Sequence, residues 1–193
     1  MEEKILNAAN IVSLLRIVLL FIFIFLIYFG AREVKAISVF LCPLIFLTDY
    51  IDGYIARRYG METKLGSYLD LLGDRVTEIV LWLFFLYLQM IPVWAPLIIF
   101  IRGFAVDYVR LKAKKKGKTV YGMLSSRAGK LLVSSSISRG GYALLKLILF
   151  TTLSLEFVFS LSLETFVLSL VIFVVIFNLI RGLPVIYEGI KFI

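Results

Sequence analysis

Histidine is absent from the 193-residue sequence, and cysteine occurs once, as Cys42. Without histidine the commonest general base is missing, so proton transfer near neutral pH must use a carboxylate, lysine, tyrosine or the lone thiol. A single cysteine excludes an intrachain disulfide. Acidic residues are also scarce, with 13 Asp and Glu against 21 Lys and Arg, and the formal net charge is +8.

Hydrophobic residues are abundant and make up 61% of the chain, with a mean hydropathy of +0.99. Soluble domains contain about 45–50% apolar residues. The composition therefore predicts an all-α, polytopic membrane protein with one domain over residues 1–193. In such a protein the positive charge indicates topology and attraction to anionic lipid, and no nucleic-acid partner is expected.

Six apolar stretches are interpreted as transmembrane helices, following a short interfacial helix over residues 1–9. They cover residues 11–29, 37–57, 66–90, 97–111, about 126–153 and 165–183. Residues 1–4 are too short and too acidic for a signal sequence, so the first stretch is interpreted as a retained span. Pro184 is expected to follow the sixth span, with a loop over residues 155–164 before it.

Lysine and arginine are distributed unevenly between the loops. They follow the second span (Arg57, Arg58, Lys64), the fourth span (the run at 112–118, then Arg127) and the sixth span (Arg181, Lys191). The turns at 91–96 and 155–164 contain no Lys or Arg. Arg32 and Lys35 are the exceptions to this asymmetry. The positive-inside rule then predicts that both termini and the face that follows the second span are cytoplasmic.

Four carboxylates lie on the cytoplasmic side of the second and third spans, at Asp49, Asp52, Asp70 and Asp74. Spacings of three and four place each pair on one helical face. Each unpaired charge in a span costs roughly 2.5–3.5 kcal/mol. Divalent cations would offset this cost, since they prefer hard oxygen ligands. The alternatives are a buried ion-pair network with nearby arginines and a cation site of a transporter.

The residues between these carboxylates add to the pattern Asp-x2-Asp-Gly-x2-Ala-Arg-x8-Gly-x3-Asp-x3-Asp over residues 49–74. Gly53 and Gly66 would allow a ligand or a neighbouring helix to approach closely, because glycine is otherwise unfavourable inside helices. Arg57, one turn after Gly53, suits a bidentate hold on phosphate.

This pattern resembles, at all of its specified positions, the signature of the CDP-alcohol phosphotransferases, integral membrane enzymes of phospholipid synthesis. The resemblance implies transfer of a phosphatidyl-type group from a CDP-linked lipid to an alcohol, with release of CMP. It implies two divalent cations, Mg²⁺ or Mn²⁺, with Ca²⁺ as a non-productive occupant. The expected metal ligands are Asp49, Asp52, Asp70 and Asp74, and Asp74 is also the expected general base.

The expected nucleotide and pyrophosphate contacts are Asn10, Ser13, Gly53, Ala56, Arg57 and Gly66. The first two belong to an Asn-x2-Ser-x2-Arg segment that ends at Arg16, and the family often carries a similar segment here. Spacings of three place these side chains on one helical face. The alternative is a helix cap followed by an arginine that reaches the membrane surface.

Four further cations suggest a pocket for a phosphorylated acceptor: Arg102, Arg110, Lys130 and Arg139. Intramembrane cations usually face a cavity, although Arg110 could instead pair with Asp107. Glycerol 3-phosphate is the expected acceptor, and inositol phosphate or another alcohol is the alternative. The segment 102–110 resembles phosphatidylglycerophosphate synthases, which usually carry Glu at the place of Gly103 and Pro at that of Leu71. A homodimer is common in the family.

Overall fold

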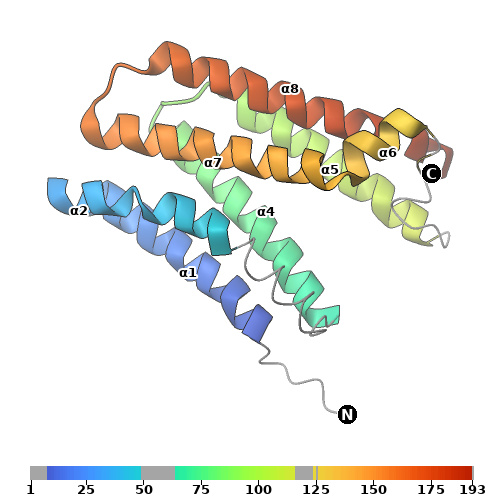
Figure 1. The fold of residues 1–193 in the computed structure, drawn as a ribbon, viewed down its shortest axis with the longest axis horizontal. Coiled ribbons are helices and arrows are strands. Elements are labelled where there is room, and N and C mark those ends of the chain that lie inside the picture. The colour runs from blue at the N-terminus through green and yellow to red at the C-terminus, as the bar shows by residue number, and fades with distance from the viewer. Residues whose placement is uncertain (1–7, 49–63, 116–123, 125, 193) are drawn as a thin grey trace. The chain divides into compact units, whose positions relative to one another are not determined.

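The computed structural model describes residues 8–48, 64–115, 124 and 126–192, and these residues contain helices and no strands. The helices whose bounds the structure describes begin with α1 (Ala8–Phe29), α2 (Arg32–Ser38), α4 (Lys64–Tyr87) and α5 (Trp94–Lys115). They are followed by α6 (Arg127–Ser134), α7 (Ser136–Phe159), α8 (Glu164–Gly189) and the short 3₁₀ helix η1 (Ile190–Phe192) (Figure 1). The predicted all-α class is confirmed.

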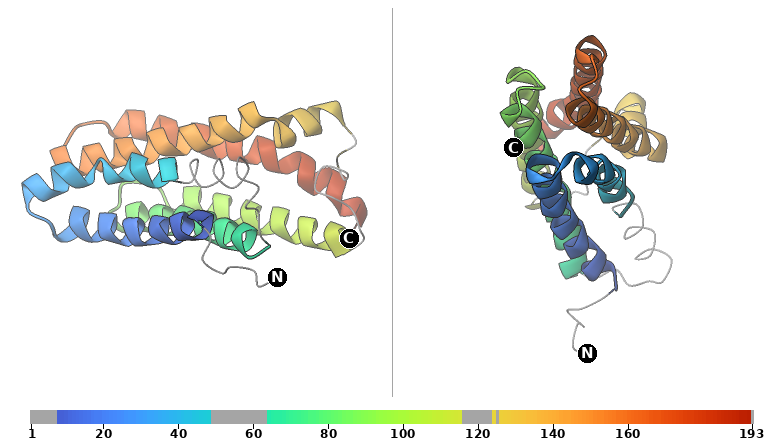
Figure 2. Two further views of the ribbon diagram at one scale, coloured as in Figure 1. Left: turned by 60° about the horizontal axis from the view of Figure 1, so that its bottom comes forward. Right: turned by 90° about the vertical axis from the view of Figure 1, so that its left-hand side faces the viewer.

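The helices divide into two compact units, and each is described by itself. The first unit contains residues 1–88 and 150–163. In it α1 packs along α4, and α2 packs against α1 (Figure 2). Aromatic rings fill its core: Phe150 stacks on Phe85 at 5.9 Å and meets Trp82 edge-on at 5.4 Å. These rings are fully buried, so the α1–α4 pair has a rigid apolar support.

The second unit contains residues 89–149 and 164–193. In it α5 packs along α8, and α6 and η1 also contact α8 (Figure 1). Val106 and Val109 of α5 are buried against Val185 of α8. Gly189 allows the close approach, because a Cβ atom at that position would collide with Val109.

The second predicted span differs from the observed structure at its start. Residues 32–38 already form α2, and a turn at 39–40 separates α2 from helical residues 41–48. Pro43 lies in the first turn of this later helix. A backbone N–H at this place would have no intrahelical acceptor, so the proline costs the helix no hydrogen bond. Helical structure therefore begins at Arg32, before the predicted start of the second span at residue 37.

The fifth predicted helix is two helices, α6 and α7. Ser135 between them is extended, with φ −65° and ψ 138°, which ends α6. Its hydroxyl accepts a hydrogen bond from the N–H of Ser138 at 3.1 Å and so caps the start of α7. The break therefore has a local cause in a serine side chain that competes with the helical backbone.

Two other helix ends lie beyond their predicted positions. α7 continues to Phe159, where Ser160 adopts a left-handed φ of 52° and the N–H of Leu161 reaches the carbonyl of Glu156 at 3.3 Å. This is the six-to-one bond that commonly terminates helices. α8 continues through Pro184 to Gly189, so the proline does not end the last span as expected.

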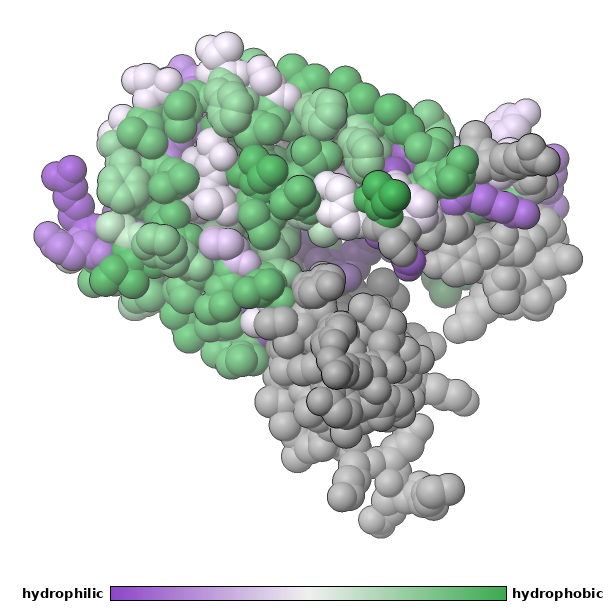
Figure 3. All heavy atoms as spheres, viewed as in Figure 1, coloured by the Kyte–Doolittle hydropathy of each residue, from purple (hydrophilic) through white to green (hydrophobic). Residues whose placement is uncertain are grey.

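Among the residues that the structure describes, two helices are long and apolar enough to cross a membrane, over residues 137–159 and 164–189. Residues 14–29 of α1 form a shorter apolar stretch, and α4 and α5 each carry several charged residues. Large hydrophobic side chains are exposed along α1, α5 and α8, and Figure 3 shows how much of the visible surface is hydrophobic. These features indicate association with a membrane.

Candidate active site

The second half of the acidic motif lies on α4, where the backbone places Asp70 and Asp74 one turn apart and Gly66 one turn earlier. The side chain of Asp74 is described and is 49% exposed. The other half of the motif lies outside the described residues. This applies to Asp49, Asp52, Gly53, Ala56 and Arg57.

Arg16 of α1 forms an ion pair with Asp74, through its Nη1 atom and the Oδ1 atom of the carboxylate. The arginine is almost completely buried, at 1% exposure, whereas its partner remains half exposed. A buried guanidinium requires compensation by an anion or by hydrogen bonds. The packing of α1 along α4 therefore joins the Asn-x2-Ser-x2-Arg segment to the acidic motif.

Positions 10, 13 and 16 lie in the first turns of α1, so Asn10 and Ser13 precede Arg16 by two turns and one turn. A spacing of three residues keeps these positions on neighbouring parts of one helical face. The predicted grouping of Asn10 and Ser13 with the motif is compatible with this backbone. Only the Arg16 side chain of the three is described.

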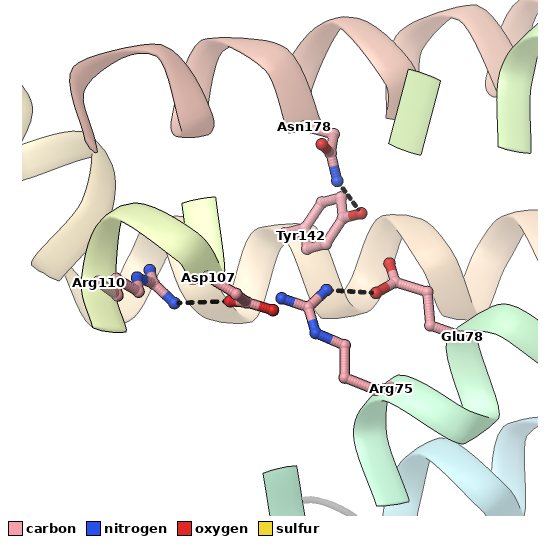
Figure 4. A network of polar contacts seen from close by, with 6 residues as sticks. All are labelled: Arg75, Glu78, Asp107, Arg110, Tyr142 and Asn178. Atoms are coloured by element: carbon pink, nitrogen blue, oxygen red, sulfur yellow. Dashed lines mark hydrogen bonds and ion pairs between the residues drawn. The ribbon is translucent and has the colours of Figure 1, made fainter. Parts of the chain in front are cut away.

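Within the described residues no three side chains of the ligating types Asp, Glu, Cys and His come together as a metal site. Of the four predicted carboxylate ligands, the side chain of Asp74 alone is among the described ones. A third carboxylate on α4, Glu78, lies one turn after Asp74 and pairs with Arg75 at 3.5 Å (Figure 4).

The four predicted acceptor cations all belong to the second unit, on three helices. Arg102 of α5 lies against Gly182 of α8, where a Cβ atom would collide with the arginine side chain. Arg110 pairs with Asp107 at 4.0 Å, which is the alternative considered from the sequence (Figure 4). Lys130 of α6 and Arg139 of α7 are exposed.

Two cations that the sequence did not single out surround Tyr142 of α7. The guanidinium carbon of Arg181 lies 5.2 Å from the centroid of the Tyr142 ring, and the Lys146 ammonium lies 4.8 Å from it. The Arg181 Nε atom is also 3.5 Å from the carbonyl oxygen of Leu132 in α6. The sequence signal that could have identified these two cations is a charge inside a predicted span, because such a charge usually marks a functional position.

The start of α6 is fixed to the end of α8 by one acidic side chain. The backbone N–H of Ser126 donates to Glu188 at 3.2 Å, and its hydroxyl donates to the other oxygen of the same carboxylate. The Ser126 hydroxyl also accepts from the N–H of Gly129 at 3.0 Å and so caps α6. This places the backbone of α6, with Lys130, beside α8.

Comparison with known proteins gives a consistent family. The CDP-alcohol phosphatidyltransferase family model matches residues 6–185, and this range contains the complete acidic motif and most of both units. A probable phosphatidylglycerophosphate synthase of Mycobacterium tuberculosis is 32% identical over 121 residues, which are 60% of this chain and 57% of that protein. The CDP-diacylglycerol–glycerol-3-phosphate 3-phosphatidyltransferase of Bacillus subtilis is 30% identical over 126 residues, which are 59% and 65% of the two chains.

A protein of the same name from Treponema pallidum is 31% identical over 114 residues, covering 59% of this chain and 51% of that protein. The matched region thus spans between about half and two thirds of the length of these relatives. The family match extends over most of the present sequence. The chain belongs to the CDP-alcohol phosphatidyltransferase family.

Proposed function

We propose that this protein transfers the phosphatidyl-type group of a CDP-linked lipid, CDP-diacylglycerol or an ether analogue, to glycerol 3-phosphate and releases CMP. The observation that carries the proposal is the complete acidic signature between residues 49 and 74, inside a family match over residues 6–185. The names of the relatives support glycerol 3-phosphate as the acceptor.

The proposed setting is a membrane bundle of six spans with both termini and the acidic motif on the cytoplasmic side. The apolar helices over residues 137–159 and 164–189 support it, as does the asymmetry of Lys and Arg between loops. A water-soluble acceptor would then meet the lipid-linked nucleotide at the cytoplasmic surface. The hydrophobic side chains exposed along α1, α5 and α8 would face lipid or a second copy of the chain.

The donor set of the motif fits divalent cations, because it consists of carboxylates, the hard ligands that Mg²⁺ and Mn²⁺ prefer. Asp49, Asp52, Asp70 and Asp74 would hold two such ions. When bound, the ions supply positive charge for the pyrophosphate and for CMP as it leaves. The nucleotide and its phosphates would be contacted by Gly53, Ala56, Arg57 and Gly66, with Asn10 and Ser13 beside them.

Asp74 would remove the proton from the acceptor hydroxyl. The acceptor oxygen then bonds to the lipid-side phosphorus, the bond from this phosphorus to the CMP oxygen breaks, and CMP leaves. The half-exposed carboxylate is accessible to a substrate, and its ion pair with buried Arg16 fixes the carboxylate in place. With no histidine in the sequence, a carboxylate is a reasonable base at this position.

The acceptor phosphate would bind to the cations of the second unit: Arg102, Arg110, Lys130, Arg139 and Arg181. The position of Arg102 against Gly182 supports this assignment, because it places the guanidinium beside the turn of α8 that carries Arg181. Arginine suits phosphate, since its planar donors bind two oxygens at once.

The test is release of CMP by the purified protein supplied with CDP-diacylglycerol, Mg²⁺ or Mn²⁺, and one acceptor at a time. The acceptors are glycerol 3-phosphate, inositol phosphate and serine. We expect turnover with glycerol 3-phosphate that EDTA abolishes and added Mg²⁺ restores. Turnover with inositol phosphate alone would keep the reaction and replace the acceptor.

The Asp74→Asn protein should lose about 10²–10⁴-fold in CMP release, the range of a positioned general base. Its matched control is Glu78→Gln, one turn further along α4, which should retain activity within a few fold. Cation uptake without CMP release, whichever acceptor is supplied, would contradict the transferase and favour a transporter. Equal activity of the Asp74→Asn and wild-type proteins would remove Asp74 as the base.

A further inference from the structure

Two tyrosine side chains mark one end of the first unit. The Tyr28 hydroxyl of α1 lies 3.2 Å from the Tyr87 hydroxyl of α4, and both side chains are exposed. Exposed tyrosines, with an apolar ring and a polar tip, are typical of the level at which a membrane meets water. Asp74 lies earlier on α4, separated from Tyr87 by a rise of about 20 Å. In the proposed membrane arrangement, this end of the unit therefore lies at the surface opposite the acidic motif.

Two cations follow directly after this end of α1, on the short helix α2. Arg32 and Lys35 are the exceptions to the distribution of Lys and Arg between the loops, and the positive-inside rule disfavours cations at this surface. A spacing of three residues places them on one helical face. Neither cation forms an ion pair with any of the residues that the structure describes. Their presence at this surface is therefore not explained by pairing with a carboxylate of the described chain.

Lys35 is held in place by an aromatic ring of α7. Its ammonium lies 5.4 Å from the centroid of the Phe157 ring, and the lysine side chain is half-buried. Such a contact orders a flexible side chain and leaves its charge intact, because the ring contributes no opposite net charge. An ordered cation loses less conformational entropy when it binds an anion.

Glu33 is the carboxylate of α2, and it follows Arg32 directly. Neighbouring positions on a helix do not face each other, and the Glu33 side chain is exposed. Two cations and one carboxylate leave α2 with a net charge of +1. The helix therefore attracts anions, and Glu33 opposes this attraction.

Exposed apolar side chains continue from the cations along the chain. α2 packs back along α1 (Figure 2), so the chain runs from Arg32 toward the interior of the membrane. Ile37 and Phe40 lie on this path and are 70% and 76% exposed. A free phosphate ion gains nothing from such side chains, whereas the acyl chains of a phospholipid cover them. The order of cations and apolar side chains thus matches that of a headgroup and its acyl chains.

We propose that α2 binds an anionic phospholipid in the leaflet opposite the acidic motif. The lipid phosphate lies at Arg32 and Lys35, and the acyl chains lie along Ile37 and Phe40. The planar guanidinium binds two phosphate oxygens at once, and the ammonium adds a point charge. This inference uses the proposed membrane arrangement and does not depend on the transferase reaction.

The test measures binding of phosphatidylglycerol to the full-length protein in a detergent without net charge. Phosphatidylcholine is the comparison lipid without net charge, and inorganic phosphate supplies the anion without acyl chains. The apparent dissociation constant is obtained from the rise in thermal unfolding temperature as each ligand is added. The variants are Arg32→Gln, Lys35→Gln, Glu33→Gln and Lys191→Gln. The last removes one positive charge from η1 in the second unit and is the control for net charge.

We expect wild-type protein to bind phosphatidylglycerol about 10-fold more tightly than phosphatidylcholine, and inorganic phosphate at the same concentration to give no stabilisation. Arg32→Gln and Lys35→Gln should each weaken binding of phosphatidylglycerol about fivefold, the contribution of one cation near an anionic lipid surface. Glu33→Gln should strengthen it, because a like charge beside the lipid phosphate is removed. Lys191→Gln should change it by no more than about twofold, since distant charges are screened.

Equal binding of the two lipids by wild-type protein overturns the proposal, and so does equal weakening by Lys35→Gln and Lys191→Gln. Stabilisation by inorganic phosphate as large as that by phosphatidylglycerol would replace the lipid by a free anion and also overturns it. The CMP assay on the same proteins separates this inference from the proposed reaction. If the wild-type protein releases no CMP and the expected pattern of lipid binding is found, the lipid surface is supported and the transferase is not. If CMP release is normal in all variants and the pattern is absent, the transferase is supported and the lipid surface is overturned.

Discussion

The pairing of Arg16 with Asp74 combines a fully buried cation with a half-exposed anion. The sequence supplied both residues, one in the Asn-x2-Ser-x2-Arg segment and one in the acidic motif. It did not predict their contact, because they are 58 residues apart and the contact depends on how α1 packs along α4. Burial of the arginine costs more free energy than the half-exposed position of the aspartate, since a guanidinium in an apolar setting cannot obtain compensation from water.

Replacement of Arg16 by methionine keeps much of the side-chain volume and removes the charge. We expect a loss of about 1–3 kcal/mol in unfolding free energy, less than for a fully buried pair because the remaining carboxylate is half hydrated. CMP release should fall as well, since Asp74 loses its fixed orientation. The measurement is thermal unfolding in detergent together with the CMP assay.

The matched control for this variant is Arg75→Met on α4. Arg75 is 31% exposed and pairs with Glu78 at 3.5 Å, three residues along the same helix. Such a pair contributes about 0–1 kcal/mol. If both variants lose the same stability, the burial of Arg16 has no special energetic role, and that would contradict the interpretation of the α1–α4 contact.

At the scale of helices, the positions of the apolar segments were predictable and several of their ends were not. Hydropathy identified the segments that become α1, α4, α5, α7 and α8. It failed at Ser135, where a side-chain cap divides one polar-rich stretch into α6 and α7. It also failed at Pro184, which lies inside α8. Both errors arise because caps and prolines act through local backbone geometry that tertiary packing can select or override.

The cap of α6 gives a prediction about that helix alone. Ser126→Ala removes the acceptor for the Gly129 N–H and the hydroxyl that donates to Glu188. We expect a cost of about 1 kcal/mol, typical of a lost N-cap. Amide hydrogen exchange should accelerate in residues 127–134 and remain unchanged in α4. Ser169→Ala, which removes an exposed hydroxyl that donates to the carbonyl of Thr165 in the same helix, should leave α6 exchange as it is.

The α5–α8 contact gives a prediction about helix spacing. Gly182→Ala adds a Cβ atom that collides with the Nε atom of Arg102 and lies close to its Cδ and Cγ atoms, so either the arginine moves or the helices separate. We expect lower thermal stability and a higher KM for glycerol 3-phosphate, with the KM for CDP-diacylglycerol unchanged.

Gly140→Ala on α7 is the control for this substitution. A Cβ atom at Gly140 meets nothing within 4 Å, so the gain in helix propensity should raise stability by about 0.5–1 kcal/mol. Similar gains from both alanines would show that Arg102 is not packed on Gly182 in the working protein.

At the scale of the whole molecule, the family was predictable because its signature is a fixed linear spacing of residues. The acidic positions, the glycines and Arg57 can be recognised without any knowledge of tertiary structure. The cluster around Tyr142 could not be predicted in this way. Its members come from positions 142, 146, 178 and 181 on two helices, and nothing in the linear pattern connects them. Local spacing therefore identified the family, and only packing revealed which side chains of α7 and α8 meet around Tyr142.

Membrane topology is the remaining property of the whole molecule, and the lone cysteine provides a direct test. Cys42 is fully buried, so the wild-type protein should react little with a membrane-impermeant maleimide. Lys115→Cys at the end of α5 and Ser162→Cys between α7 and α8 each add one exposed thiol. The six-span arrangement predicts that Ser162→Cys is labelled in intact cells and Lys115→Cys only in inverted vesicles. The physical reason is the excess of Lys and Arg in the segment after α5 and its absence between α7 and α8.

Labelling of both thiols from the same side would require an even number of crossings between residues 115 and 162. In that case α7 would not cross the membrane alone between these positions, and the six-span arrangement would be wrong.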